Sequence, residues 1–223
     1  MSENMSSGSF ARPARRLRFD RVERVAHWTI AALFGTLVAT GIPLYFGSLF
    51  GVVLDRHTIQ LIHLWVGLAL PIPLIVAATG PWGRRMRRDV RRFVYWRPDE
   101  IRWILTAGRT PVTFEKFNAG QKLNAVTTAG LNTVLLISGA MLQWFRFFPV
   151  STRVAATFVH DSFALAVSTV MVGHILMALA HPPALKSMIT GSVSTTWATR
   201  HAPNWVEDEP AGDKVTVPTK HRM

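Results

Sequence analysis

The sequence predicts an all-α integral membrane protein, a four-transmembrane-helix bundle with both termini on the cytoplasmic side. Of its 223 residues, 49% are hydrophobic and only 17% are charged, which favours a membrane protein over a soluble domain. Four stretches nearly free of charge are each long enough to cross a hydrocarbon core of about 30 Å, which takes about 20 helical residues. They are residues 25–47, 58–79, 123–145 and 154–180.

These four stretches are expected to be helices because lipid offers the backbone amides and carbonyls no hydrogen-bond partners. A four-helix bundle is the simplest way to pack them. The chain is therefore divided into a cytoplasmic N-terminal segment (1–24), a four-helix domain (25–180) and a cytoplasmic C-terminal tail (181–223).

The distribution of Lys and Arg predicts the orientation. Residues 1–24 hold six of them, residues 80–122 hold eleven and residues 181–223 hold five, whereas the two other connections together hold three. Basic connections favour the cytoplasmic side, so the sequence predicts a multi-pass protein of a bacterial cytoplasmic membrane. The net charge of +12 could suggest nucleic acid, but this orientation explains it without a DNA-binding motif.

The first half of the chain contains an N-terminal segment and two spans. The N-terminal segment has no short apolar stretch before a cleavage site, so we expect no cleavable signal peptide and a retained first helix. That helix begins after Arg24 and ends near Tyr45 and Phe46, which are aromatic residues suited to the interface. The second helix carries Pro71 and Pro73, which lack backbone donors and predict a kink.

The longest connection, residues 80–121, separates the second and third helices. Residues 83–92 are strongly basic and predict a solvated face against anionic lipid or a partner. Residues 99–106 mix apolar side chains such as Trp103 with charges, as an interfacial amphipathic helix would. The third helix then crosses outward from Lys122, and the fourth returns.

Four of the eight histidines lie within the predicted spans: His27, His63, His160 and His174. An ionisable group inside a bilayer is costly, so each is a candidate functional residue; for a single histidine, hydrogen bonding across the bundle is the alternative. His160 and His174 are 14 residues apart, which places both rings on one face of the fourth helix, about 21 Å apart along its axis. One helix thus offers ligands at two depths.

Depth in the membrane pairs these two histidines with the other two. The second helix starts outside, so His63 lies about two turns below the outer surface, level with His160. The first helix starts inside, so His27 lies near the inner surface, roughly level with His174. The pattern predicts two bis-histidine sites stacked across the membrane.

The residue types around these pairs favour haem. The chain has no cysteine, which excludes disulfides, cysteine-ligated iron–sulfur clusters and covalent c-type haem attachment. No carboxylate or cysteine completes a tetrahedral zinc shell, whereas Gly35, Gly67 and Gly139 leave room for a flat macrocycle. We therefore predict two haems whose iron, with both axial positions filled, transfers electrons. The alternative from another class is a haem-free anchor or transporter that uses the histidines as polar contacts or proton relays.

Several motifs resemble the cytochrome b, or gamma, subunit of respiratory formate dehydrogenases, over roughly residues 17–206. They are residues 24–28 (Arg-Val-Ala-His-Trp), 63–67 (His-Leu-Trp-Val-Gly), 117–122 (Phe-Asn-Ala-Gly-Gln-Lys) and the His160/His174 pair. The Asn-Ala-Gly-Gln-Lys run is the specific one, because related hydrogenase cytochromes share the helices and histidines but not that run. The resemblance implies that His27 and His174 hold an inner haem b, and that His63 and His160 hold an outer haem b.

The resemblance also implies a menaquinone site beside the inner haem, formed by Asn118, Gly120, Gln121 and His174. An amide side chain can hydrogen-bond a quinone carbonyl, and a glycine lets the ring approach the backbone. The alternative is that Asn118 caps the third helix and Gly120 only eases packing. His181 shares the face of His174 and either stabilises the helix end or helps to pass protons to the quinone.

The partners implied by the resemblance are an outer iron–sulfur electron-transfer subunit and a molybdenum or tungsten catalytic subunit, in a complex compatible with a higher oligomer. We assign this chain no catalytic residue. It is expected to pass electrons from the outer donor through two haems b to menaquinone near the cytoplasmic face, as a subunit of an oxidoreductase complex. A cytochrome subunit of a hydrogenase or of another molybdoenzyme is the alternative, because no residue here acts on formate.

Overall fold

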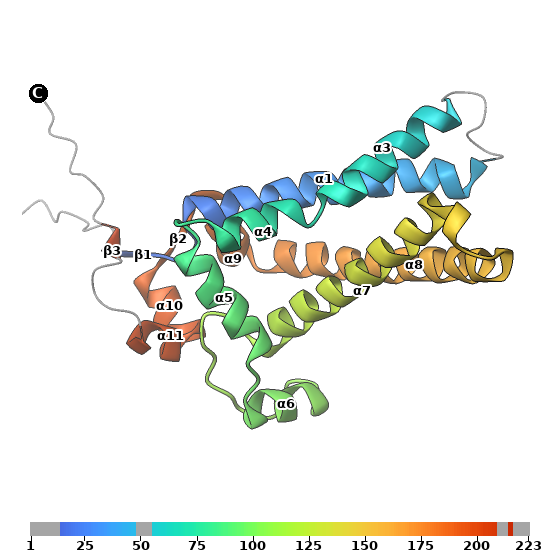
Figure 1. The fold of residues 1–223 in the computed structure, drawn as a ribbon. Coiled ribbons are helices and arrows are strands. Elements are labelled where there is room, and N and C mark those ends of the chain that lie inside the picture. Colours follow the sequence, from blue (N-terminus) through green and yellow to red (C-terminus); the bar gives the residue numbers. More distant parts are fainter. Residues whose placement is uncertain (1–13, 48–54, 209–213, 216–223) are drawn as a thin grey trace, which may run out of the picture.

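Four membrane-length helices run side by side in the computed structural model, which describes residues 14–47, 55–208 and 214–215 (Figure 1). Within these residues, four spans are long and apolar enough to cross a membrane. They are α1 (Arg21–Tyr45), α3 (Arg56–Ala69) continued by α4 (Ile72–Thr79), α7 (Ala119–Gln143) and α8 (Val150–Ala180). The predicted all-α membrane fold with four spans is confirmed.

Three of the helices, α1, α7 and α8, begin four residues earlier than hydropathy predicts, and in α1 and α7 polar side chains cap the extended start. Asp20 caps α1 and accepts a hydrogen bond from the Glu23 amide, while the Glu23 carboxylate accepts one from the Asp20 amide. Asn118 and Gln121 form the same reciprocal box at the start of α7. Such boxes satisfy the first free amides of a helix, so the helix extends into the polar interface beyond its apolar part.

The second span is interrupted where the sequence predicts a kink. Helix α3 ends at Ala69, and α4 begins after Pro71, with Pro73 in its first turn. At the break the Leu70 amide bonds the Gly67 carbonyl, three residues back, at 3.3 Å. The proline at 71 has no amide to continue the ladder, so the chain divides into two helices there.

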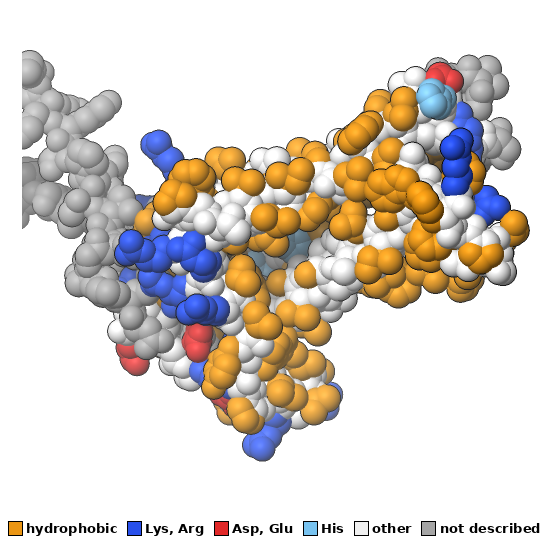
Figure 2. Space-filling model, in the orientation of Figure 1, with side chains coloured by type: hydrophobic (Ala, Val, Ile, Leu, Met, Phe, Trp, Pro, Cys, Tyr) orange, Lys and Arg blue, Asp and Glu red, His pale blue; other side chains and the backbone are white. Residues whose placement is uncertain are grey.

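The spans are arranged as two hairpins. Helix α1 packs along α3 and α4, and α7 packs along α8, whereas α3 meets α7 only over a short stretch. Large apolar side chains cover the outside of the rod (Figure 2), including Phe158, which is 74% exposed, and Leu165, which is 72% exposed. An apolar exterior along the spans is the surface that a lipid environment requires.

The connection between the hairpins forms two further helices, α5 (Arg84–Val94) and α6 (Pro98–Leu105). Helix α6 projects sideways from the rod (Figure 1) and exposes Leu105, as an interfacial helix does. It is attached to α7 by a fully buried ion pair in which the Lys122 ammonium lies 2.7 Å from the Glu100 carboxylate. The same ammonium donates to the Tyr95 carbonyl.

Both ends of the described chain meet in a small cap at the end of the rod that carries α5 (Figure 1). A three-stranded antiparallel sheet has the order β2-β1-β3, and Val193, Ala198, Ala202 and Trp205 form a small core beside it. The remaining elements are η1 (Phe145–Phe147), β1 (Arg15–Leu17), α9 (Pro182–Thr190), β2 (Ser192–Ser194), α10 (Thr195–His201), α11 (Pro203–Asp208) and β3 (Lys214–Val215).

The cap is the main feature that the sequence does not predict, since residues 181–223 are expected only to be a polar tail. Its strands have two or three residues each, too few for an alternating pattern to stand out. Strand β1 also pairs with a strand that follows it by more than 170 residues.

Candidate functional site

The four span histidines lie between the two hairpins as two pairs of facing rings. The His27 ring on α1 and the His174 ring on α8 have centroids 6.3 Å apart. The His63 ring on α3 and the His160 ring, also on α8, have centroids 6.3 Å apart. Helix α8 therefore contributes one ring to each pair, at positions about 21 Å apart along its axis.

The spacing within each pair suits a single metal ion. An ion bound between two imidazole nitrogens lies about 2 Å from each, and each nitrogen lies roughly 1 Å from its ring centroid. Two rings with centroids 6.3 Å apart can therefore share one ion between them. The described residues contain no cluster of three or more His, Asp or Glu side chains that could hold a metal. Each pair thus offers two imidazoles to one ion, a ligand set that would suit the iron of a haem.

Hydroxyl groups orient both rings of the His63/His160 pair. Thr40 Oγ1 lies 2.8 Å from His63 Nδ1 and also donates to the Thr36 carbonyl at 2.8 Å. Because a hydroxyl has one hydrogen to donate, its oxygen must then accept from Nδ1–H. This leaves the lone pair of His63 on Nε2, the nitrogen available to a metal.

His160 has the same arrangement on the other hairpin. Ser138 Oγ donates to the Val134 carbonyl at 2.8 Å and lies 3.0 Å from His160 Nδ1. A glycine follows the hydroxyl residue in both cases, and a Cβ at Gly41 or Gly139 would lie 3.5 or 3.2 Å from the Cε1 atom of the facing histidine. These Thr-Gly and Ser-Gly dipeptides were missed as histidine supports; a hydroxyl residue followed by glycine inside a span is the signal that could have found them.

The His27/His174 pair is supported differently. Asn124 Nδ2 lies 3.3 Å from His174 Nδ1, so an amide occupies the place that a hydroxyl has in the His63/His160 pair. An asparagine amide can present either its NH₂ group or its oxygen at this position, and the oxygen would accept from Nδ1–H. The Trp28 ring packs edge-on against His27 and donates its indole N–H to the Met188 carbonyl at 3.0 Å. Asn124 was also missed, although it stands three residues after Gln121 and six after Asn118.

Three of the four residues predicted to contact a quinone, Asn118, Gly120 and Gln121, lie at the start of α7. The fourth, His174, lies on α8. Asn118 and Gln121 have the capping role that was the alternative interpretation, with Gln121 N to Asn118 Oδ1 at 2.8 Å and Asn118 N to Gln121 Oε1 at 3.0 Å. The box uses only the side-chain oxygens. The NH₂ group of each amide therefore remains available as a donor, and both Gly120 and Gln121 are exposed.

His181 is the C-cap residue of α8, and its Nδ1 atom lies 2.8 Å from the Met177 carbonyl.

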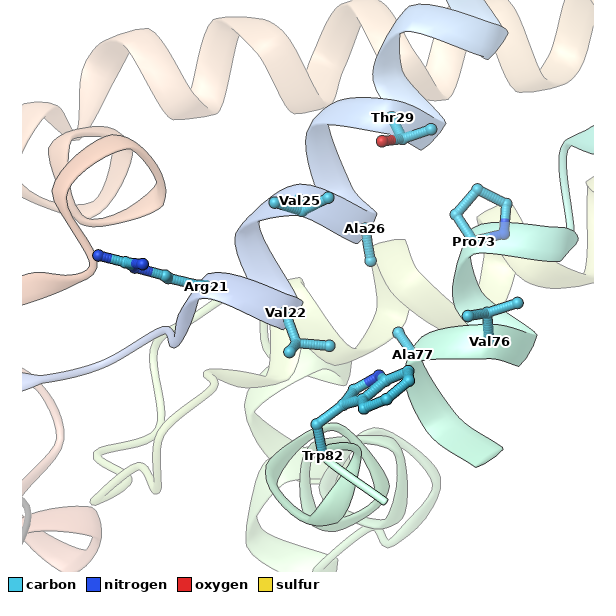
Figure 3. A pocket seen from close by; sticks show the side chains of 9 residues that line it. All are labelled: Arg21, Val22, Val25, Ala26, Thr29, Pro73, Val76, Ala77 and Trp82. Carbon is cyan, nitrogen blue, oxygen red and sulfur yellow. The ribbon is translucent and has the colours of Figure 1, made fainter. Parts of the chain in front are cut away.

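A separate apolar groove of about 320 Å³ lies between α1 and α4 (Figure 3). Val22, Ala26 and Val76 line it beside Trp82, and none of the span histidines does. This groove is therefore distinct from the histidine pairs.

Comparison with known proteins places the chain among membrane cytochromes. The family model described as prokaryotic cytochrome b561 matches residues 18–191. The nitrate-inducible formate dehydrogenase cytochrome b556(Fdn) subunit of Escherichia coli is 25% identical over 203 residues, covering 84% of this chain and 88% of that protein. The E. coli formate dehydrogenase cytochrome b556(fdo) subunit is 26% identical, covering 86% and 92%. The formate dehydrogenase cytochrome b556 subunit of Haemophilus influenzae is 24% identical, covering 92% and 88%.

The stretch that matches the family model includes all four spans and all four span histidines. It also covers well over half of the chain. The chain belongs to the prokaryotic cytochrome b561 family.

Proposed function

We propose that this chain is the diheme cytochrome b membrane subunit of a respiratory dehydrogenase similar to formate dehydrogenase. It connects an outer-side electron donor to menaquinone reduced near the cytoplasmic face. The observation that carries the proposal is the two pairs of facing histidine rings, each 6.3 Å apart and both using α8. Membership of a cytochrome b family implies haem b as cofactor. Two haems b bound at these pairs would supply one-electron transfer at two depths of the membrane.

The haem ligands in this proposal are His27 with His174 at the inner site and His63 with His160 at the outer site. Other side chains of the protein orient these rings. Thr40 and Ser138 fix the outer tautomers through Nδ1, which keeps each Nε2 available.

The names of the relatives, which are cytochrome subunits of formate dehydrogenases, support a role for this chain within a complex of several subunits. We propose an iron–sulfur subunit as the outer electron donor and a molybdenum or tungsten subunit as the site of substrate oxidation. The basic end of the rod (Figure 2), which carries α5, is assigned to the cytoplasm of a bacterial cell by the positive-inside rule. Under this assignment both termini are cytoplasmic.

The quinone site is assigned to Asn118, Gly120, Gln121 and His174. Quinone carbonyls are acceptors and need donors, and the capping box leaves the NH₂ groups of Asn118 and Gln121 available. Asn124 lies on the same stretch of α7 and forms a hydrogen bond with His174 at the Nδ1 atom of the histidine. This contact links the start of α7 to His174. We therefore place quinone reduction at the cytoplasmic end of the inner histidine pair.

A pyridine haemochrome assay on the purified full chain tests the central claim. We expect two haem b per chain, because the structure offers two complete pairs of imidazole ligands. A folded chain that assembles with its partner subunits but contains no haem would favour the rival function, a membrane anchor or transporter.

The hydroxyl support of the outer pair gives a second expected result. Thr40→Val should weaken haem binding at the His63/His160 site by about 10–100-fold, as loss of a hydrogen bond to a ligand histidine typically does. Haem titration of the stripped full chain measures this change. Thr36→Val is the matched control, because among the described residues the Thr36 hydroxyl donates to the Ala32 carbonyl of the same helix and to no histidine. Equal haem affinity in the two variants would show that Thr40 does not support the site.

A further inference from the structure

A cluster of buried charges lies at the cytoplasmic end of the inner histidine pair, and neither haem binding nor quinone binding accounts for it. Glu23 of α1, Asp89 of α5 and Lys116, which precedes α7, are 4%, 4% and 2% exposed. The Lys116 ammonium contacts the Asp89 carboxylate directly and lies 3.4 Å from Glu23 Oε1. The two carboxyl groups are also within hydrogen-bonding reach of each other.

The two carboxyl groups are not equally neutralised. Asp89 receives the close contact from Lys116 and a second ion pair with Arg92 at 3.2 Å. Arg18 also acts on Asp89 through its charge; burial lowers the pKa of Arg18 to about 10, so it remains a cation at neutral pH. Within the described part of the chain, the cation contact of Glu23 is the longer one with Lys116, and Glu23 faces the Asp89 carboxylate.

Burial and a neighbouring carboxyl group both favour the protonated form of a carboxyl group, and a cation at a longer distance offsets them less than a cation in close contact. When protonated, Glu23 can donate its hydrogen to Asp89, while its second oxygen still accepts from the Asp20 amide at 2.7 Å. Glu23 is therefore the member of the cluster best placed to hold an exchangeable proton.

Two members of the cluster are close along the chain to residues of the proposed inner haem site and quinone site. Glu23 is four residues before His27 on α1, one turn nearer the basic end of the rod. Lys116 is two residues before Asn118. Phe117, between them, is buried against Phe93 and Phe19, which fixes this stretch of chain against α5 and the start of α1.

We propose that Glu23, held by Asp89 and Lys116, is the group that delivers protons from the cytoplasmic side to the quinone. This inference rests on the proposed function, because it needs quinone reduction at the inner site. Each quinone takes up two electrons, supplied through the haems, and two protons to become a quinol. In each transfer the O–H bond of Glu23 breaks and an O–H bond to a quinone oxygen forms. Lys116 stabilises the resulting carboxylate, which regains a proton from the cytoplasm through Asp89.

The test is reoxidation of the reduced full chain by 2,3-dimethyl-1,4-naphthoquinone, followed by stopped-flow absorbance from about pH 6 to about pH 9. Wild-type reoxidation should slow as pH rises through the titration of Glu23, because the ionised form has no proton to give. Glu23→Gln should slow reoxidation by about 100-fold and remove that pH step, which is the scale of general acid catalysis. Glutamine preserves the capping box, so the helix start should be retained. Acetic acid at high concentration should restore part of the rate.

Asp20→Asn is the matched control, because it removes the other carboxyl of the same box while asparagine caps equally well. It should keep the wild-type rate and pH profile. A Glu23→Gln chain with full haem content and wild-type reoxidation at every pH would overturn the proposal. Loss of haem from that variant would also overturn it, by assigning Glu23 a structural role. If the wild-type chain were not reoxidised by the quinone, the proposed function would fail and this inference with it.

Discussion

His63→Ala and His160→Ala should each remove the same one of two haems and leave the other haem bound. The reason is that the two rings face each other with centroids 6.3 Å apart, so either change leaves one imidazole where two are needed. His27→Ala and His174→Ala should together affect the other haem. Haem content per chain should fall from about two to about one in each single variant, since a bis-imidazole site needs both ligands.

Redox titration with visible spectra gives the sharper measurement, because the two haems are expected to show separate transitions. The double variant His63→Ala/His160→Ala should lose no more haem than either single variant. By contrast, His63→Ala/His174→Ala should lose both haems, because each substitution removes a ligand from a different pair. If His27→Ala and His63→Ala affected the same transition, the assignment of the pairs would be wrong.

Replacing the amide side chains of Asn118 and Gln121 by carboxylates should slow quinone reduction without destabilising the start of α7. Asn118→Asp and Gln121→Glu keep the side-chain oxygens that form the capping box and remove only the NH₂ groups. Each lost hydrogen bond to a quinone carbonyl is worth about 0.5–1.5 kcal/mol, so reoxidation by a menaquinone that is slower by about two- to tenfold is expected per variant. Both haems should remain bound and reducible by the donor.

Asn118→Leu separates the two roles of this residue. It removes the cap as well as the donor, and loss of a cap costs about 1 kcal/mol of stability. We therefore expect slower reoxidation in both Asn118 variants but a lower thermal midpoint only in Asn118→Leu. Wild-type reoxidation in Asn118→Asp and Gln121→Glu would leave these residues with the capping role alone, as would a quinone-site inhibitor that crosslinks near His63.

The sequence predicts the spans well because each depends on a local property. Hydropathy over about 20 residues identifies a membrane helix, and the proline pair predicts the break between α3 and α4. Helix starts are less accurate, since Asp20 and Asn118 extend α1 and α7 beyond their apolar parts. The small cap at the end of the rod is not predicted, because its strands are short and its pairing joins the two ends of the described chain.

The sequence by itself determines the number of spans, the four histidines inside them and the depth of each ring along its helix. All of these follow from composition and from the fixed rise of an α-helix. Only the tertiary structure decides that Thr40 and Ser138 orient the outer histidines, that Asn124 supports His174 and that Glu23 shares a buried cluster with Asp89 and Lys116. These contacts join residues between 22 and 93 positions apart. No local periodicity encodes them, because they depend on how the two hairpins and α5 pack against one another.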